Sequence, residues 1–313
     1  MKKILALVAS IMMLGTVAFA LTGCSDSPFV KALQNASDKA ESITASFDGI
    51  EIVSDTANLT FVASDECKIE YTTHKRILYS TEVDSGILKI KLEDNRRWFQ
   101  KIFSFGDSSK LTVYLPAGEY SSLTIKQDTG DINVPADYKF GYVDIDLSTG
   151  DTKFSASAGE AIKICASTGD ITLENVSCGS LKTKVSTGKT TLTNVAVAGD
   201  ASVTVSTGKS YLTNVSCTNF ASAGNTGNID MTSLIASERI DISRTTGDVT
   251  FDRCDAAEIY VETSTGDVKG TFLTDKIFQT YTSTGKINVP ECWEGGKCKI
   301  TTTTGKIEIS IGQ

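Results

Sequence analysis

A Thr-Gly pair recurs ten times in the last two-thirds of the chain, and successive pairs lie 19 or 20 residues apart. A fixed period of this length is typical of repeat proteins, whose units stack because no single unit can bury its own apolar face. The ten glycines are Gly130, Gly150, Gly169, Gly188, Gly208, Gly227, Gly247, Gly266, Gly285 and Gly305. Each period is therefore predicted to form one rung of a stacked coil.

Apolar residues hold fixed positions around each of these glycines. The residue seven positions before the glycine is apolar in all ten repeats, and the residue five positions before it is apolar in seven. Steps of two are typical of β-strands, in which alternate side chains point inward. The frequent Ile, Val and Thr favour strands, and so short a repeat leaves no room for helices. The sequence thus predicts an all-β protein, a parallel β-solenoid (β-helix) of about ten rungs over residues 123–313, roughly 50 Å long.

The Thr-Gly pair is predicted to form a sharp corner in every rung. Glycine reaches positive φ without a Cβ clash, so an invariant glycine indicates a bend that must recur in the same form. Hydroxyl groups stacked at the corners could bond to neighbouring rungs or to the corner backbone. Asn175, Asn194 and Asn214 share another register and are predicted to stack as an amide ladder.

The N-terminus has the pattern of a secretory signal. Lys2 and Lys3 precede an apolar run over residues 4–20, which is short for a membrane span. The sequence Leu-Thr-Gly-Cys at residues 21–24 resembles the bacterial lipobox, which implies cleavage before Cys24 and attachment of diacylglycerol to its sulfur. Residues 1–23 are then the lipoprotein signal peptide and residues 24–46 a lipidated tether. The alternative is an ordinary signal with an incidental cysteine.

Charge limits the partners of the predicted extracytoplasmic protein. The formal net charge is −8, and loss of the two lysines in the signal peptide lowers it to −10. An acidic surface argues against binding nucleic acid and against electrostatic docking on anionic lipid. We therefore expect the lipid on Cys24 to hold the protein at the bacterial cell membrane.

The cysteines and the histidine offer no metal site. Seven cysteines remain after Cys24, and no pair has the CxxC spacing of a zinc site. Cys254 occupies a position held elsewhere by valine, which indicates a small core side chain. Cys292 and Cys298 could close a return as a disulfide or remain free. His74 is the only histidine in the sequence, so a histidine-based metal cluster is excluded.

Residues 47–122 alternate like strands but lack the Thr-Gly corner, and they are predicted to form an N-terminal β cap on the solenoid. Within this cap, residues 96–105 are basic and aromatic on an otherwise acidic protein. One interpretation is a loop that folds back to plug the end of the solenoid. The other is a tip that contacts a partner or membrane through Arg97, Trp98, Phe99 and Phe103.

Catalysis has little support in the sequence. Asp131, Asp151 and Asp170 follow successive glycines and would form a row about 5 Å apart, which could bind Ca²⁺ or simply suit the turn. A carbohydrate-active enzyme of the β-helix type would need such clustered carboxylates. No nucleophile elbow, phosphate loop or dinucleotide fingerprint is present. We therefore predict a protein that is not an enzyme and that uses no metal or other cofactor.

The Ser-Thr-Gly-Asp motifs at residues 148–151, 167–170 and 264–267 resemble the bacterial putative-adhesin family of β-strand repeats, formerly a domain of unknown function. The strand at residues 111–116, which ends in Leu-Pro, is also similar to that family. The resemblance covers about residues 45–311, although Lys or Asn follows half of the glycines here. It implies an extracytoplasmic β-solenoid with no defined catalytic residues.

We expect a monomeric, lipid-anchored, adhesin-like interaction or structural module of the cell envelope that binds a protein or glycan. The alternatives are an envelope-stress sensor or regulator that binds a membrane partner, and a carbohydrate-active β-helix enzyme.

Overall fold

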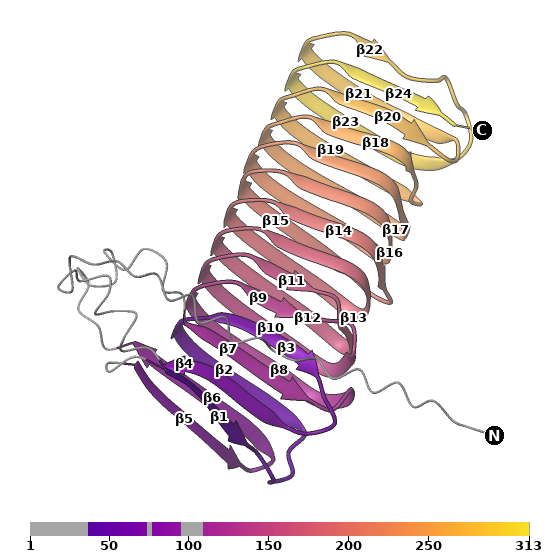
Figure 1. The fold of residues 1–313 in the computed structure, drawn as a ribbon. Coiled ribbons are helices and arrows are strands. Elements are labelled where there is room, and N and C mark those ends of the chain that lie inside the picture. Colours follow the sequence, from indigo (N-terminus) through magenta and orange to yellow (C-terminus); the bar gives the residue numbers. More distant parts are fainter. Residues whose placement is uncertain (1–36, 74–76, 95–108, 313) are drawn as a thin grey trace, which may run out of the picture. The chain divides into compact units, whose positions relative to one another are not determined.

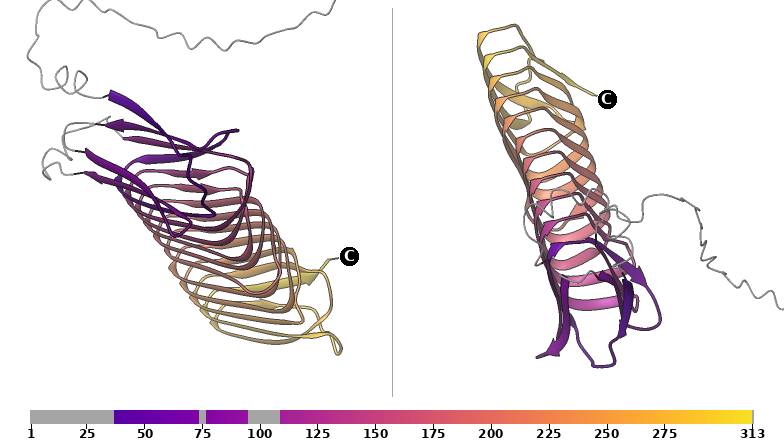
Figure 2. Two further views of the ribbon diagram at one scale, coloured as in Figure 1. Left: turned by 90° about the horizontal axis from the view of Figure 1, so that it is seen from below. Right: turned by 60° about the vertical axis from the view of Figure 1, so that its left-hand side comes forward.

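The computed structural model describes residues 37–73, 77–94 and 109–312. The regular secondary structure of this part consists of β-strands alone. All the strands join one continuous sheet that winds into a coil (Figure 1). Figure 2 shows the stacked rungs from two further directions. The predicted all-β parallel solenoid is confirmed.

The central rungs stack in the order of the sequence. Their strands are β8 (Gly118–Thr129), β9 (Ile132–Val134), β10 (Tyr138–Thr149), β11 (Thr152–Phe154), β12 (Ser157–Thr168), β13 (Ile171–Thr187), β14 (Thr190–Val197), β15 (Ala201–Thr207), β16 (Ser210–Thr226), β17 (Ile229–Thr246), β18 (Val249–Cys254), β19 (Glu258–Thr265) and β20 (Val268–Phe272). Equivalent strands of successive rungs pair in parallel with equivalent residues aligned, as Leu123 with Val143 and Val143 with Ile162. All three side chains are buried. The apolar positions of the repeat therefore form the interior columns of the coil.

The structure confirms the sharp corners that were predicted at the Thr-Gly pairs. Nine of the ten repeat glycines have φ between 117° and 155°, a region that favours glycine. The Gly130 N–H donates to the Thr149 carbonyl at 2.9 Å, and the same bond links the following corners. A Cβ on these glycines would overlap the carbonyl oxygen of the corner stacked beneath. Close stacking, as well as φ, thus requires glycine.

A second bend carries the predicted asparagine ladder. The Asn194 side-chain amide donates to Asn175 Oδ1 at 2.9 Å, and the Asn214 amide donates to Asn194 Oδ1 at 2.9 Å. These residues have φ of 57°, 54° and 54°, a left-handed conformation that asparagine tolerates better than most residues. The ladder is confirmed, and the backbone explains why asparagine occupies this bend.

Asn194→Ala is expected to lower the free energy of unfolding by about 2 kcal/mol, because it loses two amide bonds and places alanine in a left-handed conformation. Asn194→Gly, which relieves the backbone but also loses the amide, should recover roughly half of this loss. Urea unfolding of the two variants measures both effects. Equal losses in both variants would show that the left-handed backbone contributes nothing.

The N-terminal end departs from sequence order. Its strands are β1 (Ser37–Ser42), β2 (Gly49–Thr56), β3 (Asn58–Ala63), β4 (Lys68–Thr73), β5 (Ile77–Asp84), β6 (Ile87–Asp94) and β7 (Lys110–Leu115). Strands β2 and β3 form a further rung, which lies between the β6–β7 rung and the β8–β9 rung. Its corner is Ala57, stacked beneath Gly130. Because alanine replaces the glycine, the repeat pattern missed this rung.

Antiparallel strands complete this cap. Strand β5 pairs with β6, β4 pairs with β7, and β1 pairs with β4. The sequence suggested a tether over residues 24–46, but Ser37–Ser42 of that stretch forms β1. Its backbone bonds to β4 explain why a polar segment without apolar periodicity is ordered here.

The C-terminal end shows the same exchange of order. Its strands are β21 (Lys276–Thr284), β22 (Ile287–Asn288), β23 (Gly296–Thr304) and β24 (Ile307–Ile311). Strand β23 pairs with both β19 and β21, and β24 pairs with both β20 and β22. The last rung in the sequence therefore lies between two earlier ones, and the β21–β22 rung ends the coil. The rungs at this end therefore do not stack in the order of the sequence.

Candidate interaction surfaces

The site residues predicted from the sequence lie outside the described residues. Cys24 precedes Ser37, and Arg97, Trp98, Phe99 and Phe103 fall between β6 and β7. Lys110, the first residue of β7, pairs with Asn58, the residue after the Ala57 corner. The segment with Trp98 therefore joins β6 to β7 in the sequence and lies outside the described residues.

The aspartates that follow the corner glycines bond to the backbone of the neighbouring rung. The Asp151 N–H donates to Asp131 Oδ1 at 2.9 Å, and the Asp170 N–H donates to Asp151 Oδ1 at 2.8 Å. The same bond recurs from Asp131 to Asn58, Lys189 to Asp170, Asp248 to Asn228, Asp267 to Asp248 and Lys306 to Asp267. One oxygen of each stacked aspartate or asparagine therefore satisfies a corner N–H, which is a structural role.

This column has little capacity for chemistry. Asp170 Oδ2 also forms an ion pair with Lys189 Nζ at 2.9 Å, and that hydrogen bond raises the pKa of Lys189. Within the described ranges, no group of three or more histidine, cysteine or acidic side chains could hold a metal ion. The arrangement supports the turn interpretation over the calcium interpretation.

Asp151→Ala is expected to lower the free energy of unfolding by about 1 kcal/mol, because the Asp170 N–H loses its acceptor. Asp151→Asn keeps an oxygen at the same place and should lose less. Lys209→Ala is a control in the same register, because a lysine side chain has no oxygen that could accept the N–H of the next corner. The effect of this substitution on the free energy of unfolding should stay within about 0.5 kcal/mol. Chemical unfolding of the three variants measures these differences. A shift of the unmodified protein's melting temperature by millimolar Ca²⁺ would contradict the structural role.

The described cysteines are all free thiols. Cys254 is fully buried, as its valine-like position predicted, and burial raises the pKa of its thiol to about 11. Cys298 is buried on β23, whereas Cys292 is half-buried, with its Sγ 3.8 Å from Asp275 Oδ1. These two cysteines form no disulfide in the structure, where both are free thiols.

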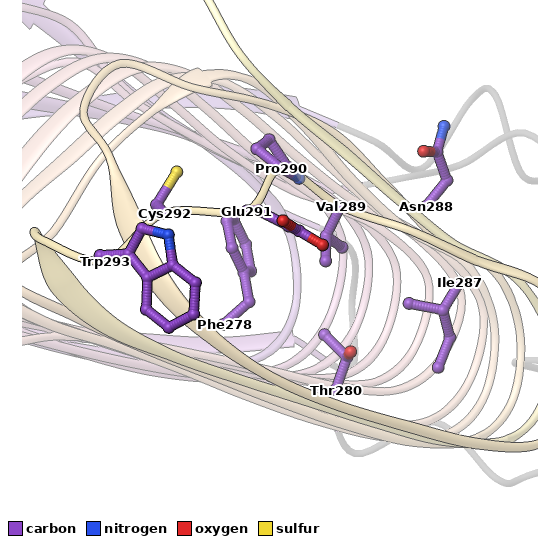
Figure 3. A pocket seen from close by; sticks show the side chains of 9 residues that line it. All are labelled: Phe278, Thr280, Ile287, Asn288, Val289, Pro290, Glu291, Cys292 and Trp293. Atoms are coloured by element: carbon purple, nitrogen blue, oxygen red, sulfur yellow. The ribbon is translucent and has the colours of Figure 1, made fainter.

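The β21–β22 rung forms an open end that the repeat pattern could not reveal. Residues at interior positions, including Phe278 and Val289, are only half-buried because nothing in the described structure covers them. With Ile287, Pro290 and the 89% exposed Trp293, they line a hollow of about 430 Å³ (Figure 3). The sequence did contain an indication of this end. Residues 277–284 carry no charge, and the polar segment that follows them contains a tryptophan, Trp293.

Arg244 is a second feature absent from the sequence interpretation. Its side chain is 2% exposed inside the coil, where one nitrogen donates to Ser222 Oγ at 2.7 Å. Gly224 lies in register beneath it, and a Cβ there would overlap the guanidinium. Nε and Nη1 have no hydrogen-bond partner in the described structure, and burial lowers the pKa of Arg244 to about 10.

The described residues include no helix that is long and apolar enough to cross a membrane. The fold and its surfaces define a β-solenoid repeat protein whose corner carboxylates serve the backbone. The chain belongs to the Toastrack DUF4097 family, whose model matches residues 47–208 and 199–313. This confirms the repeat family expected from the Ser-Thr-Gly-Asp motifs.

Several solved structures are distantly similar to the chain. A putative adhesin from Bacteroides fragilis NCTC 9343 is 12% identical, with 88% of this chain and 98% of that chain covered and a TM-score of 0.45. A putative adhesin from Parabacteroides distasonis ATCC 8503 is 8% identical, with 87% and 96% covered and a TM-score of 0.47. No curated protein matches the chain significantly. At these identities and scores, no function is inferred from the neighbours.

Proposed function

We propose that this protein is a lipid-anchored, non-catalytic module of the cell envelope that binds an envelope protein or glycan along its faces. The observation that carries the proposal is the use of the corner carboxylates. The side chains best placed for catalysis in a β-helix are those of Asp131, Asp151 and Asp170. Each of them accepts a hydrogen bond from a backbone N–H of the next rung. What remains for function is the outer surface of the coil.

The outer faces suit many weak contacts. Lys163 Nζ lies 3.0 Å from Asp144 Oδ1, and Lys153 Nζ lies 3.2 Å from Glu174 Oε2, each pair joining neighbouring rungs. Exposed pairs of this kind contribute little to stability, so they are free to exchange their partners for groups of a ligand. A surface with charge pairs between several of the rungs favours binding to a repetitive polymer or an extended protein.

The predicted anchor supports an envelope location. The chain enters the coil through β1, in the cap. If Cys24 carries lipid, the covalent connection to the membrane joins the capped end, and the open end is the other terminus of the coil.

Binding of residues 37–313 to isolated envelope material tests the proposal, since this fragment is a compact unit by itself. We expect saturable cosedimentation that weakens with added salt, as screened ionic contacts do. The heat-unfolded fragment is the control for nonspecific adsorption. Failure to bind any envelope polymer or protein, or release of products from polyuronates that depends on Asp151 and Asp170, would overturn the proposal.

An envelope-stress sensor or regulator is a second candidate, and one observation favours it. The described strands β4 and β5 already pair with β7 and β6, the strands of the outermost rung. The strand edges of this rung therefore need less covering by a further segment. In this candidate function, the segment containing Trp98 and Phe103, which lies outside the described residues, binds the partner. Trp98→Ser with Phe103→Ser should leave thermal melting unchanged and abolish crosslinking of one dominant membrane partner in cells. A lowered melting temperature would instead support the plug.

A further inference from the structure

The two ends of the coil differ in how their outermost strand edges are protected. At the capped end the edge strands are β1 and β5, which carry Asp38, Lys39, Glu41, Glu82 and Asp84. Charged side chains on an edge discourage pairing with another chain. At the open end, β21 pairs only with β23 among the described strands. Its other side presents unpaired backbone groups.

The edge of β21 has none of the usual protection. Residues 277–284 contain no charged side chain. Lys276, the first residue of the strand, is 1% exposed, and its Nζ lies 2.6 Å from Asp255 Oδ1. Thr280, Thr282 and Thr284 add a strong preference for strands. On the other strand of this rung, Pro290 follows β22 and lacks an N–H, so pairing is confined to β21.

Apolar side chains gather around this edge. The described chain has eight exposed large hydrophobic side chains, and five of them lie between residues 273 and 293. They are Leu273, Ile277, Tyr281, Ile287 and Trp293. The half-buried Phe278 stacks on Phe272 of the coil, with ring centroids 6.4 Å apart, and its other side faces the hollow of the open end (Figure 3). The interior column of the solenoid therefore continues to a surface that is still apolar.

We propose that the open end binds a second copy of this chain, with the two β21 strands paired antiparallel about a two-fold axis. With the axis at Thr280, Gln279 faces Tyr281 of the second copy, and Phe278 faces its Thr282. This pairing keeps interior residues opposite interior residues, since side chains alternate along both strands. No like charges meet, because the edge has none.

The two-fold arrangement also limits the assembly to a dimer. An isologous interface uses the same surface of both copies, so pairing consumes both open ends. The capped ends carry charged edges and do not continue the stack. The proposed closed dimer differs from the monomer expected from the sequence, and this inference does not depend on the ligand of the outer faces.

Sedimentation velocity of the 37–313 fragment, at concentrations up to about 100 µM, tests the proposal. This range is needed because small interfaces are often weak. The informative variant is Gln279→Lys with Tyr281→Lys, because both side chains are exposed and each new lysine would oppose another across the axis. We expect dimerisation to weaken at least about ten-fold, since directly opposed like charges are destabilising. The control is Ala221→Lys with Ala223→Lys, which occupies the same exposed register on an interior rung.

The unmodified fragment should be a dimer, the control variant should remain one, and the edge variant should be a monomer with the same circular dichroism. Hydrogen exchange of the unmodified fragment gives an independent measure, in which amides of residues 277–284 gain protection as concentration rises. A monomer at every concentration overturns the proposal, and so does a dimer that the edge variant retains. Oligomers that grow without limit would indicate head-to-tail stacking instead.

Discussion

Gly208→Ala is expected to lower the free energy of unfolding by roughly 4 kcal/mol or more, at the upper end of single-substitution effects. Gly208 has φ of 135°, and a Cβ there would overlap the carbonyl oxygen of Gly188. The clash cannot be relieved by moving a side chain, because both groups belong to stacked backbone. The Gly188 and Gly208 rungs must separate locally, which breaks corner bonds between them such as that from the Gly188 N–H to the Thr207 carbonyl at 3.0 Å.

Gly159→Ala is the matched control for this prediction. Gly159 lies in a strand of the same coil, but its added Cβ would meet only the Phe140 carbonyl oxygen at 4.0 Å, and its φ is not left-handed. We expect its stability to change by less than about 1 kcal/mol. Urea unfolding followed by circular dichroism measures both variants. If Gly208→Ala were as stable as Gly159→Ala, the stacked corners would not be in van der Waals contact.

Arg244→Met is expected to raise the free energy of unfolding by about 1–4 kcal/mol, the range seen when buried ionic groups are replaced by apolar residues of similar size. Arg244 is buried in register with Gly224 and Thr263 of the neighbouring rungs, and it forms no ion pair in the described structure. Two of its nitrogens have no hydrogen-bond partner there. A methionine avoids this desolvation and still occupies the space above Gly224.

The benefit of Arg244→Met should depend on pH. Burial lowers the pKa of Arg244 to about 10, whereas the unfolded side chain keeps the higher pKa of an ordinary arginine. Below pH 10 both states are protonated and the folded protein carries the full desolvation cost. Above pH 10 the unfolded state holds more protons than the folded state, so the unmodified protein gains stability relative to the variant. The difference between the two proteins should therefore narrow as pH rises above about 10.

Arg239→Met is the control, because Arg239 lies on the same strand with its side chain 44% exposed. Its effect should remain below about 1 kcal/mol at every pH, as for other exposed ion pairs. Chemical unfolding at several pH values compares the three proteins. A destabilised Arg244→Met protein would mean that the guanidinium makes net favourable contacts inside the coil.

The sequence by itself determined the rung. Glycine at a fixed period, apolar residues in steps of two around it, and asparagines in one register are local patterns, and each has a local physical cause in φ, alternation or side-chain bonding. The structure confirms all three patterns, for example in the positive φ of Gly130, the buried side chain of Leu123 and the amide bond of Asn194. Even the aspartate column could be weighed correctly, since a turn residue is the simpler interpretation of Asp151.

Only the tertiary structure decided which rung stacks on which. Backbone pairing between parallel strands is the same for any two rungs, so the period carries no information about their order in space. The Ala57 rung, the insertion of β23–β24 beneath β21–β22, and the open end with Trp293 all follow from contacts between distant segments. The burial of Arg244 was hidden for the same reason, because the space it occupies is left by Gly224 of the rung beneath.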